Sequence, residues 1–356
     1  MIVFIYGTTA EAIKIAPVAR RLKDRGIAYE SWVTYQHTDS LRTIIPELGL
    51  AEPTRVIADG NRGRPLRSSF DVIRWLASVA TWTLKNARSI RKSMPEGSVI
   101  VVHGDTLTTA LGVVIARRLR LPSAHVEAGL RSGNWRHPFP EELDRRFAGR
   151  FATIHYPPSM EAVEHLSGRE NVVYTHGNTV IDAVLDQGHD AHSESEQYGV
   201  VLLHRYEFVS NKQLVEATFD TLVGESPVPL KLLVDAYSGH GLQETLDKHA
   251  DSNLTVQGKL RHPEFIGLLK GAAFIVTDSG GIQAESALLG VPTLIHRRAV
   301  EQSEGLGENI VLSEWKIDRL SHFLANFEDY RREVPRPTKS PSDIIVDDLC
   351  HRGFCK

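Results

Sequence analysis

Short apolar segments alternate with helix-forming segments along most of this 356-residue chain. The run Ser98–His103 is nearly all apolar and β-branched, which is typical of a strand buried on both faces of a parallel sheet. Repeated strand–helix–strand order predicts an α/β fold with a doubly wound parallel sheet and helices on both faces. In the first half we predict strands at Ile2–Tyr6, Tyr29–Thr34, Ser98–His103, Ser123–Glu127, Ala152–Tyr156 and Val172–Thr175, with helices through about Arg25 and from Thr108 to Leu119.

The same pattern restarts after Gly177. It predicts two Rossmann-like domains, 1–178 and 179–340, with a C-terminal helix in 341–356 completing the first. Domains of this kind bind ligands at the carboxyl ends of their strands, so we expect a central cleft between them. The second half contains predicted strands at Gly199–Leu203, Lys231–Ala236, Leu254–Gln257, Phe274–Thr277 and Thr293–His296, and helices at Pro263–Gly271 and Gly281–Gly290.

The charge balance excludes some partners. A net charge of −3 and a pI near 6.6 argue against a general nucleic-acid or anionic-membrane surface. The sequence has no apolar run long enough to span a membrane and no secretory segment, so we expect a cytoplasmic protein. The only two cysteines are Cys350 and Cys355. We interpret them as free thiols rather than as a disulfide framework or a metal site.

Basic residues and tryptophans are interleaved between positions 61 and 93, a pattern that can mark nucleic-acid binding. An amphipathic helix explains it better. Its predicted apolar face consists of Val72, Leu76, Val79, Ala80 and Leu84.

Three acidic residues stand where a predicted strand ends or a loop meets a helix. Asp105 follows VIVVHG, Glu127 follows SAHV, and Glu141 follows HPFP. They are expected at one sheet edge, where mutual repulsion would raise at least one pKa and suit acid–base chemistry. Alternatively, Asp105 and Glu141 are helix-capping or first-turn acids. That explanation is reasonable for any one of these acids but poor for all three together.

Three further segments contain candidate binding residues. In TDSGGIQAESALLGVP, free N–H groups at Ser279, Gly280 and Gly281 would favour an anion, and Glu285 could reach a ribose. In LLHRYEF, His204 and Arg205 follow a strand. The first turn, GTTAEAIK, resembles an anion-binding turn, yet its first cation is Lys14.

Together these motifs resemble the non-hydrolysing UDP-N-acetylglucosamine 2-epimerases, whose fold is that of the GT-B glycosyltransferases. The resemblance runs from Gly7 to about Leu312. It implies interconversion of UDP-GlcNAc and UDP-ManNAc through anti elimination of UDP to 2-acetamidoglucal and re-addition. It implies no cofactor or metal, and a homodimer formed through the first domain. The matching segments are GTTAEAIKIAPV, TYQH, HGDTLTT, HVEAGLRSG with PEELDR, HGNTVIDA, HRYE and TDSGGIQAESALLGVP.

The resemblance also implies site residues. Asp105, Glu127, Glu141 and His204 match the catalytic positions, and which acid removes the C2 proton stays open. The matching substrate-binding positions are Lys14, Phe265, Ser279, Gly280, Gly281 and Glu285, to which we add Arg131 and Arg205 as neighbouring cations.

Two arginines expected from the family are absent. Thr9-Ala10 replaces Arg-Pro, and Gln302 replaces the arginine of T-E-R-P-E. A lost charge-assisted contact costs about 1.5–3 kcal/mol, so UDP would bind more weakly without compensation. Candidates for compensation are Arg131, Arg136, Arg297 and Arg298. In the family's allosteric region Gln36 and His37 remain, but Thr38, Asp39 and Tyr206 differ from the usual residues, which predicts little activation by substrate.

Three alternatives remain open. A hydrolysing variant would release ManNAc and UDP, although the loop typical of hydrolysing enzymes is absent. A GT-B glycosyltransferase would need an acceptor site, which the sequence does not reveal. A non-catalytic sugar-nucleotide-binding protein would have no reason to retain all four catalytic positions.

Overall fold

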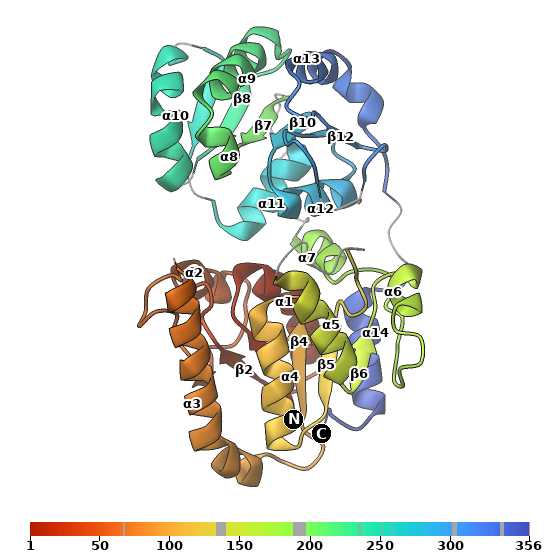
Figure 1. Cartoon of the computed structure of the whole chain (residues 1–356). Helices are drawn as coiled ribbons and strands as arrows, with labels where there is room; N and C mark the ends of the chain where they lie inside the picture. The colour runs from red at the N-terminus through yellow and green to blue at the C-terminus, as the bar shows by residue number, and fades with distance from the viewer. Residues whose placement is uncertain are drawn as a thin grey trace. The chain divides into compact units, whose positions relative to one another are not determined.

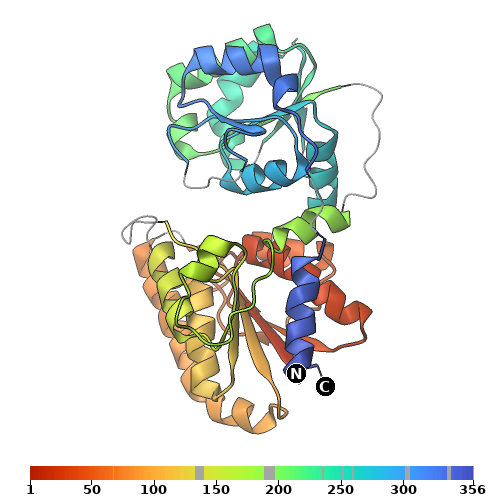
Figure 2. The ribbon, with the colours of Figure 1, turned by 90° about the vertical axis from the view of Figure 1, so that its right-hand side faces the viewer.

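The computed structural model describes residues 1–66, 68–132, 140–187, 197–234, 236–250, 252–258, 260–300, 305–334 and 338–355. The chain forms two compact units, shown in Figures 1 and 2. Unit 1 comprises Met1–Ala183 and Pro337–Lys356, and unit 2 comprises Val184–Arg336. Within the described residues, no helix has both the length and the apolar character needed to cross a bilayer.

Unit 1 contains a six-stranded parallel sheet with the order β3-β2-β1-β4-β5-β6. Alternate residues of a strand point to opposite faces. Phe4 therefore packs on the side of α1, α2 and α14, whereas Ile5 packs on the side of α3 and α4. The strands are β1 Ile2–Tyr6, β2 Tyr29–Val33, β3 Arg55–Val56, β4 Val99–His103, β5 Ser123–Val126 and β6 Ile154–Tyr156. The helices are α1 Thr9–Asp24, α2 Asp39–Glu47, α3 Ser69–Ser93, α4 Leu107–Leu119, α5 Glu141–Phe151, α6 Met160–Glu164 and α14 Pro341–His351. Helix α7, Val180–Gln187, begins in unit 1 and ends in unit 2.

Unit 2 repeats this topology with the order β12-β11-β10-β7-β8-β9, again parallel. Val201 packs with α9 and α13 on one face, and Val200 packs with α11 and α12 on the other. The strands are β7 Gly199–Leu202, β8 Leu230–Leu233, β9 Leu254–Gln257, β10 Phe274–Thr277, β11 Thr293–Ile295 and β12 Ile310–Leu312. The helices are α8 Tyr206–Val209, α9 Lys212–Glu225, α10 Ala236–Lys248, α11 His262–Gly271, α12 Gly280–Leu289 and α13 Ile317–Asn326, followed by a 3-10 turn at Phe327–Tyr330.

Each sheet has one point where the strand order reverses. In unit 1 it lies between β1 and β4, and in unit 2 between β7 and β10. Open α/β sheets bind ligands at the carboxyl ends of the strands beside this switch point. The turns after these strands are therefore the places to look for a functional site.

Most predicted strands are confirmed, with three differences. Val172–Thr175 is not a strand, because only Val172 bridges to His155 at the edge of the sheet. The stretch Lys231–Ala236 is shorter than predicted, since β8 ends at Leu233 and α10 begins at Ala236. The two short edge strands β3 and β12 were not predicted.

Helix α3 forms as predicted, but a different face is buried. Its buried residues are Trp75, Val79, Thr83, Ala87 and Ile90. Trp75 is fixed by a hydrogen bond from its Nε1 to the carbonyl oxygen of Thr34. Leu84, predicted on the buried face, is 67% exposed and lies in an exposed stripe with Phe70 and Ile73, here called the α3 apolar stripe. Hydrophobic period alone could not distinguish the two faces.

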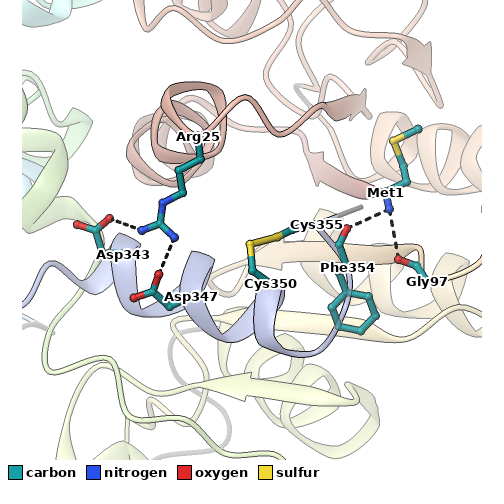
Figure 3. Close-up of a disulfide and its surroundings, with 8 residues drawn as sticks. All are labelled: Met1, Arg25, Gly97, Asp343, Asp347, Cys350, Phe354 and Cys355. Carbon is teal, nitrogen blue, oxygen red and sulfur yellow. Dashed lines mark hydrogen bonds and ion pairs between the residues drawn. A yellow bond between two sulfur atoms is a disulfide. The ribbon is translucent and has the colours of Figure 1, made fainter.

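The prediction of free thiols was wrong, because Cys350 and Cys355 form a disulfide (Figure 3). Cys350 lies in the last turn of α14, and Gly353, at a φ of 86°, reverses the chain so that Cys355 returns to it. The reversed chain also meets the N-terminus, whose ammonium group donates hydrogen bonds to the carbonyl oxygens of Gly97 and Phe354. Sequence separation of the cysteines could not reveal this reversal.

Replacing Cys350 with serine should lower the free energy of unfolding by about 2 kcal/mol, the value expected for closing a short loop. Urea denaturation of the oxidised wild-type protein and the C350S variant measures this difference. The C350S/C355S double variant serves as the control and should match the single variant, because both lack the same cross-link. Equal stability of oxidised wild type and C350S would show that the disulfide does not stabilise the fold.

Candidate functional site

The first turn of unit 1 is occupied by the protein's own carboxylate. Glu11, which is 2% exposed, accepts hydrogen bonds at Oε2 from the N–H groups of Gly7 and Thr8, both at 2.9 Å, and from the Thr8 hydroxyl. Its Oε1 accepts from the hydroxyls of Thr106 and Thr109. The N–H groups of Gly7 and Thr8 are therefore not free to bind a phosphate, contrary to the expectation of an anion-binding turn.

Glycine is required at the start of this turn. A Cβ atom at Gly7 would lie 2.1 Å from the Thr34 hydroxyl oxygen and 2.4 Å from that of Thr108. Thr8 then caps α1, and Glu11 completes a capping box with it. The resemblance of this segment to an anion-binding turn thus arises from tight packing and helix capping. The Thr9 hydroxyl points instead to Ser40, at 3.2 Å.

Glu127 is held by a cation and a side-chain amide. It follows β5 directly and has a φ of 66°, an uncommon backbone conformation for a residue other than glycine. Lys14 Nζ donates to both of its carboxylate oxygens, at 2.9 and 3.0 Å, and Asn178 Nδ2 donates to Oε1 at 2.6 Å. Lys14, predicted as a UDP ligand, therefore lies with a predicted catalytic acid.

Two buried histidines border Glu127 and are neutral. Burial, followed by the nearby charge of Lys14, holds the pKa of His103 well below its usual value. Its Nδ1 lies 3.4 Å from Glu127 Oε2 and its Nε2 lies 3.2 Å from the Thr179 hydroxyl. Burial also lowers the pKa of His125, whose Nε2 lies 2.7 Å from the Gly104 carbonyl oxygen. Because both imidazole rings are neutral, Lys14 is the cation that pairs with Glu127 among the described residues of unit 1.

Asp105 lies in the turn after β4 and pairs with Arg145 of α5, at 2.5 Å. Glu142, which is on α5 near Arg145, is completely buried. Burial alone would raise the pKa of Glu142, but hydrogen bonds from Ser132 and Arg146 outweigh that effect and leave the pKa below its usual value. Glu142 therefore holds the start of α5 beside Asp105 as a carboxylate.

Glu141 and Arg131 have different environments. Glu141 begins α5, and its buried Oε2 accepts no hydrogen bond from any described residue. Arg131 donates to the Leu130 carbonyl oxygen at 2.7 Å and packs against Gly149 of α5, and burial lowers its pKa. The structure thus places Arg131 along α5 rather than in the Lys14–Glu127 pair.

In unit 2, His204 is held by an aspartate at the neighbouring strand end. Asp278 follows β10, is 1% exposed, and accepts at Oδ2 from the N–H groups of His204 and Arg205, both at 2.9 Å. Its Oδ1 lies 3.0 Å from His204 Nδ1. A carboxylate in this position fixes the imidazole ring and stabilises its charged form.

The Gly-Gly turn of unit 2 differs in part from the prediction. Ser279 is the residue before α12, but its N–H is used by the Thr277 hydroxyl, so it is not free for an anion. Gly280 and Gly281 begin the helix, where the first N–H groups have no partner within the helix. Glu285, predicted to reach a ribose, is 8% exposed and lies 3.6 Å from His262 Nε2.

A pocket of about 270 Å³ in unit 2 is lined in part by predicted site residues. His204, Phe265 and Ser279 line it together with apolar residues of β7, β8 and α12. An apolar pocket with a few polar groups is typical of small-ligand sites. A second cavity, of about 480 Å³, is lined by residues of β12 and α13 and contains none of the predicted site residues.

Several polar residues that the structure places here were not predicted from the sequence. Asp278 follows a buried strand directly, the same signal that identified Asp105 and Glu127, and so it could have been found. Asn178 and Arg145 carry no such signal, because only the fold brings them to their acids. Gln302, which replaces an expected arginine, and Arg136, a candidate to compensate for it, lie outside the described residues. Arg297 is half-buried and Arg298 exposed beyond β11.

Comparison with known proteins gives consistent matches over nearly the whole chain. The family model described as UDP-N-acetylglucosamine 2-epimerase matches residues 21–337. A UDP-N-acetylglucosamine 2-epimerase of Bacillus subtilis is 28% identical over 99% of this chain and 96% of its own length. One from Salmonella typhimurium is 30% identical over 85% of this chain and 83% of its own length.

The same likeness holds for solved structures. The Methanocaldococcus jannaschii UDP-GlcNAc 2-epimerase, crystallised with UDP-GlcNAc and UDP, has a TM-score of 0.74 and 25% identity. The match covers 98% of this chain and 99% of that one. Two six-stranded parallel sheets with this order confirm the predicted fold class, two Rossmann-like halves of a GT-B-like protein.

Proposed function

The chain belongs to the UDP-N-acetylglucosamine 2-epimerase family, and we propose on that basis that it interconverts UDP-GlcNAc and UDP-ManNAc. The observation that carries this proposal is the pairing of acid–base groups near the carboxyl ends of the strands in both units. Glu127 with Lys14 lies in unit 1, and His204 with Asp278 lies in unit 2. Relatives with this name support an epimerase, and one of them binds UDP-GlcNAc and UDP.

We propose an elimination–addition mechanism. A carboxylate removes the proton from C2 while the bond from C1 to the UDP oxygen breaks, which gives 2-acetamidoglucal and UDP. UDP then adds back to C1, and a proton is delivered to C2 on the opposite face. No electrons leave the substrate, so no redox cofactor is needed. The reaction requires acid–base groups and a means to hold UDP between the two steps.

We propose that the acids of unit 1 have different roles in this reaction. Glu127 is held by Lys14 and Asn178, so we assign it the role of a fixed carboxylate that orders the site. Asp105 is similarly paired with Arg145. Glu141 keeps a buried oxygen without a described hydrogen-bond donor. We therefore propose Glu141 as the residue best able to exchange a proton with C2.

Unit 2 supplies the proposed nucleotide site. The pocket at Phe265 and Ser279 lies beside His204, and the first N–H groups of α12 favour a negative charge there. We propose that Gly280, Gly281 and Arg205 contribute to binding UDP, with His204 assisting the departing diphosphate. Glu285 faces His262, which makes its proposed contact with ribose dependent on that pair.

One observation keeps a hydrolysing variant as a second candidate. Because Thr9 replaces the expected arginine, unit 1 offers the diphosphate one cationic contact fewer than the family pattern implies. Weaker retention of UDP would let water capture the intermediate. Incubation with UDP-GlcNAc followed by ¹H and ³¹P NMR tests this. We expect UDP-ManNAc as the product. Free UDP that rises in step with ManNAc would show that the protein hydrolyses UDP-GlcNAc instead of epimerising it.

We also propose a homodimer formed through unit 1. The α3 apolar stripe, Phe70, Ile73 and Leu84, is exposed by 62–67% along one face of a long helix. Exposed apolar stripes of this kind mark protein interfaces. Sedimentation equilibrium of the wild type and of an I73E variant distinguishes the states, since a charge on the stripe should shift a dimer toward monomer.

A further inference from the structure

Asp144 is a buried carboxyl group that the proposed mechanism leaves without a role. It lies one helical turn after Glu141 on α5, and its side chain is buried, with 7% of the residue exposed. Its Oδ2 accepts no hydrogen bond from any described residue. Glu142, on the same helix, contrasts with it, because Ser132 and Arg146 donate hydrogen bonds to that carboxylate.

The charges that act on Asp144 are negative. Asp105 approaches from the turn after β4, and Glu141 lies on its own helix. Arg145, the nearest cation in sequence, is engaged with Asp105 and lies 3.6 Å from Glu142. Helix α4, which packs along α5, carries its charges only in its last turn, where Arg117 lies over Phe151.

A buried carboxyl group with two acidic neighbours is costly to ionise. Burial, followed by the charges of Asp105 and Glu141, raises the pKa of Asp144 to about 7. The sequence argument expected a raised pKa among Asp105, Glu127 and Glu141. Instead, it falls on a fourth acid that lies deeper, beside two of them.

We propose that Asp144 is a positioning residue that gains or loses a proton near neutral pH and thereby sets the charge that Asp105 and Glu141 present to an anionic substrate. This inference rests on the proposed function. Protonated Asp144 removes one negative charge from the cluster and offers an O–H donor to a neighbouring carboxylate. Its ionisation above neutral pH adds a charge next to Asp105 and Glu141. Binding of a UDP-sugar should weaken as that charge appears.

The kinetic test compares the pH dependence of wild type and Asp144→Asn. For the wild type, kcat/KM should fall by at least about 10-fold between pH 6.5 and 8.5, because the protonated fraction of a group with a pKa near 7 falls in this range. In D144N, which cannot ionise, the fall should be less than about 2-fold. Exposed Glu161→Gln in the same unit is the control for a lost charge, and it should keep the wild-type profile. An unchanged profile in D144N would overturn the proposal.

A second readout does not depend on enzyme activity. Because the folded-state pKa is raised, Asp144 favours folding most at low pH, and this contribution is lost as pH rises from about 4 through about 7. The melting temperature of D144N relative to the wild type should therefore increase between pH 5 and 8.5, while that of E161Q stays parallel. Parallel curves for D144N would overturn the proposal even if epimerisation is observed. If the wild type shows no epimerisation, the melting curves still test the protonation of Asp144.

Discussion

Replacing Glu127 with glutamine should lower kcat by about 10³-fold while leaving the protein folded. Removing one preorganised electrostatic group from an active site typically costs about 10²- to 10³-fold in rate, and Glu127 connects Lys14, Asn178 and the buried His103 in one network. Glutamine has nearly the same shape but cannot balance the Lys14 charge. Steady-state kinetics with UDP-GlcNAc at several pH values measure the loss, and the melting temperature shows whether the fold is retained.

The matched control is a cycle of K14M, E127Q and the double variant. If the ion pair acts as a unit, the double variant should be no slower than the slower of the two single variants. Losses that multiply would mean that Lys14 and Glu127 work independently, with Lys14 binding UDP as the sequence suggested. An E127Q enzyme within about 3-fold of the wild type would show that Glu127 only supports the fold.

The second large effect concerns Asp278. Asp278→Asn should lower kcat by about 10²-fold, because the amide cannot stabilise a charged imidazole on His204. The amide oxygen can still accept from the N–H groups of His204 and Arg205, so the strand ends should keep their conformation. KM should change less than kcat, since the change affects a step of the reaction more than the binding of the substrate.

Two further variants separate position from charge. Asp278→Ala also removes the acceptor of two backbone hydrogen bonds, so it should lower the free energy of unfolding by about 1–3 kcal/mol in addition to the kinetic loss. Asp318→Asn, on the exposed start of α13, removes a charge from unit 2 without touching His204 and should behave as the wild type. Equal kcat values for D278N and D318N would contradict the role given to Asp278.

Much of the fold could be predicted from local pattern. Runs such as Val99–His103 are apolar and β-branched throughout, because both faces of a central parallel strand are buried. The rule that polar residues follow such strands identified Asp105, Glu127 and His204, and the structure places each of them beside a polar partner. The ends of these strands can be predicted because side-chain polarity and burial change at the same residue.

The remaining features depend on contacts between distant segments. Glu11 reads as a first-turn helix acid, and only the fold brings Thr106 and Thr109 to its other oxygen. Likewise, α3 has two candidate apolar faces, and the hydrogen bond from Trp75 to the Thr34 carbonyl oxygen decides which of them is buried. The family resemblance predicted that Lys14 would contact UDP. Its length also lets it reach Glu127, and pattern cannot distinguish these uses.

The central claim, proton exchange at C2 through loss and return of UDP, is tested most directly by solvent isotope incorporation. The enzyme is incubated with UDP-GlcNAc in deuterated water, and the C2 position of both UDP-sugars is followed by ¹H NMR. We predict UDP-ManNAc carrying deuterium at C2 and, as equilibrium is approached, deuterium at C2 of recovered UDP-GlcNAc. UDP-ManNAc that forms with its original C2 proton, or no change in UDP-GlcNAc at all, would contradict it.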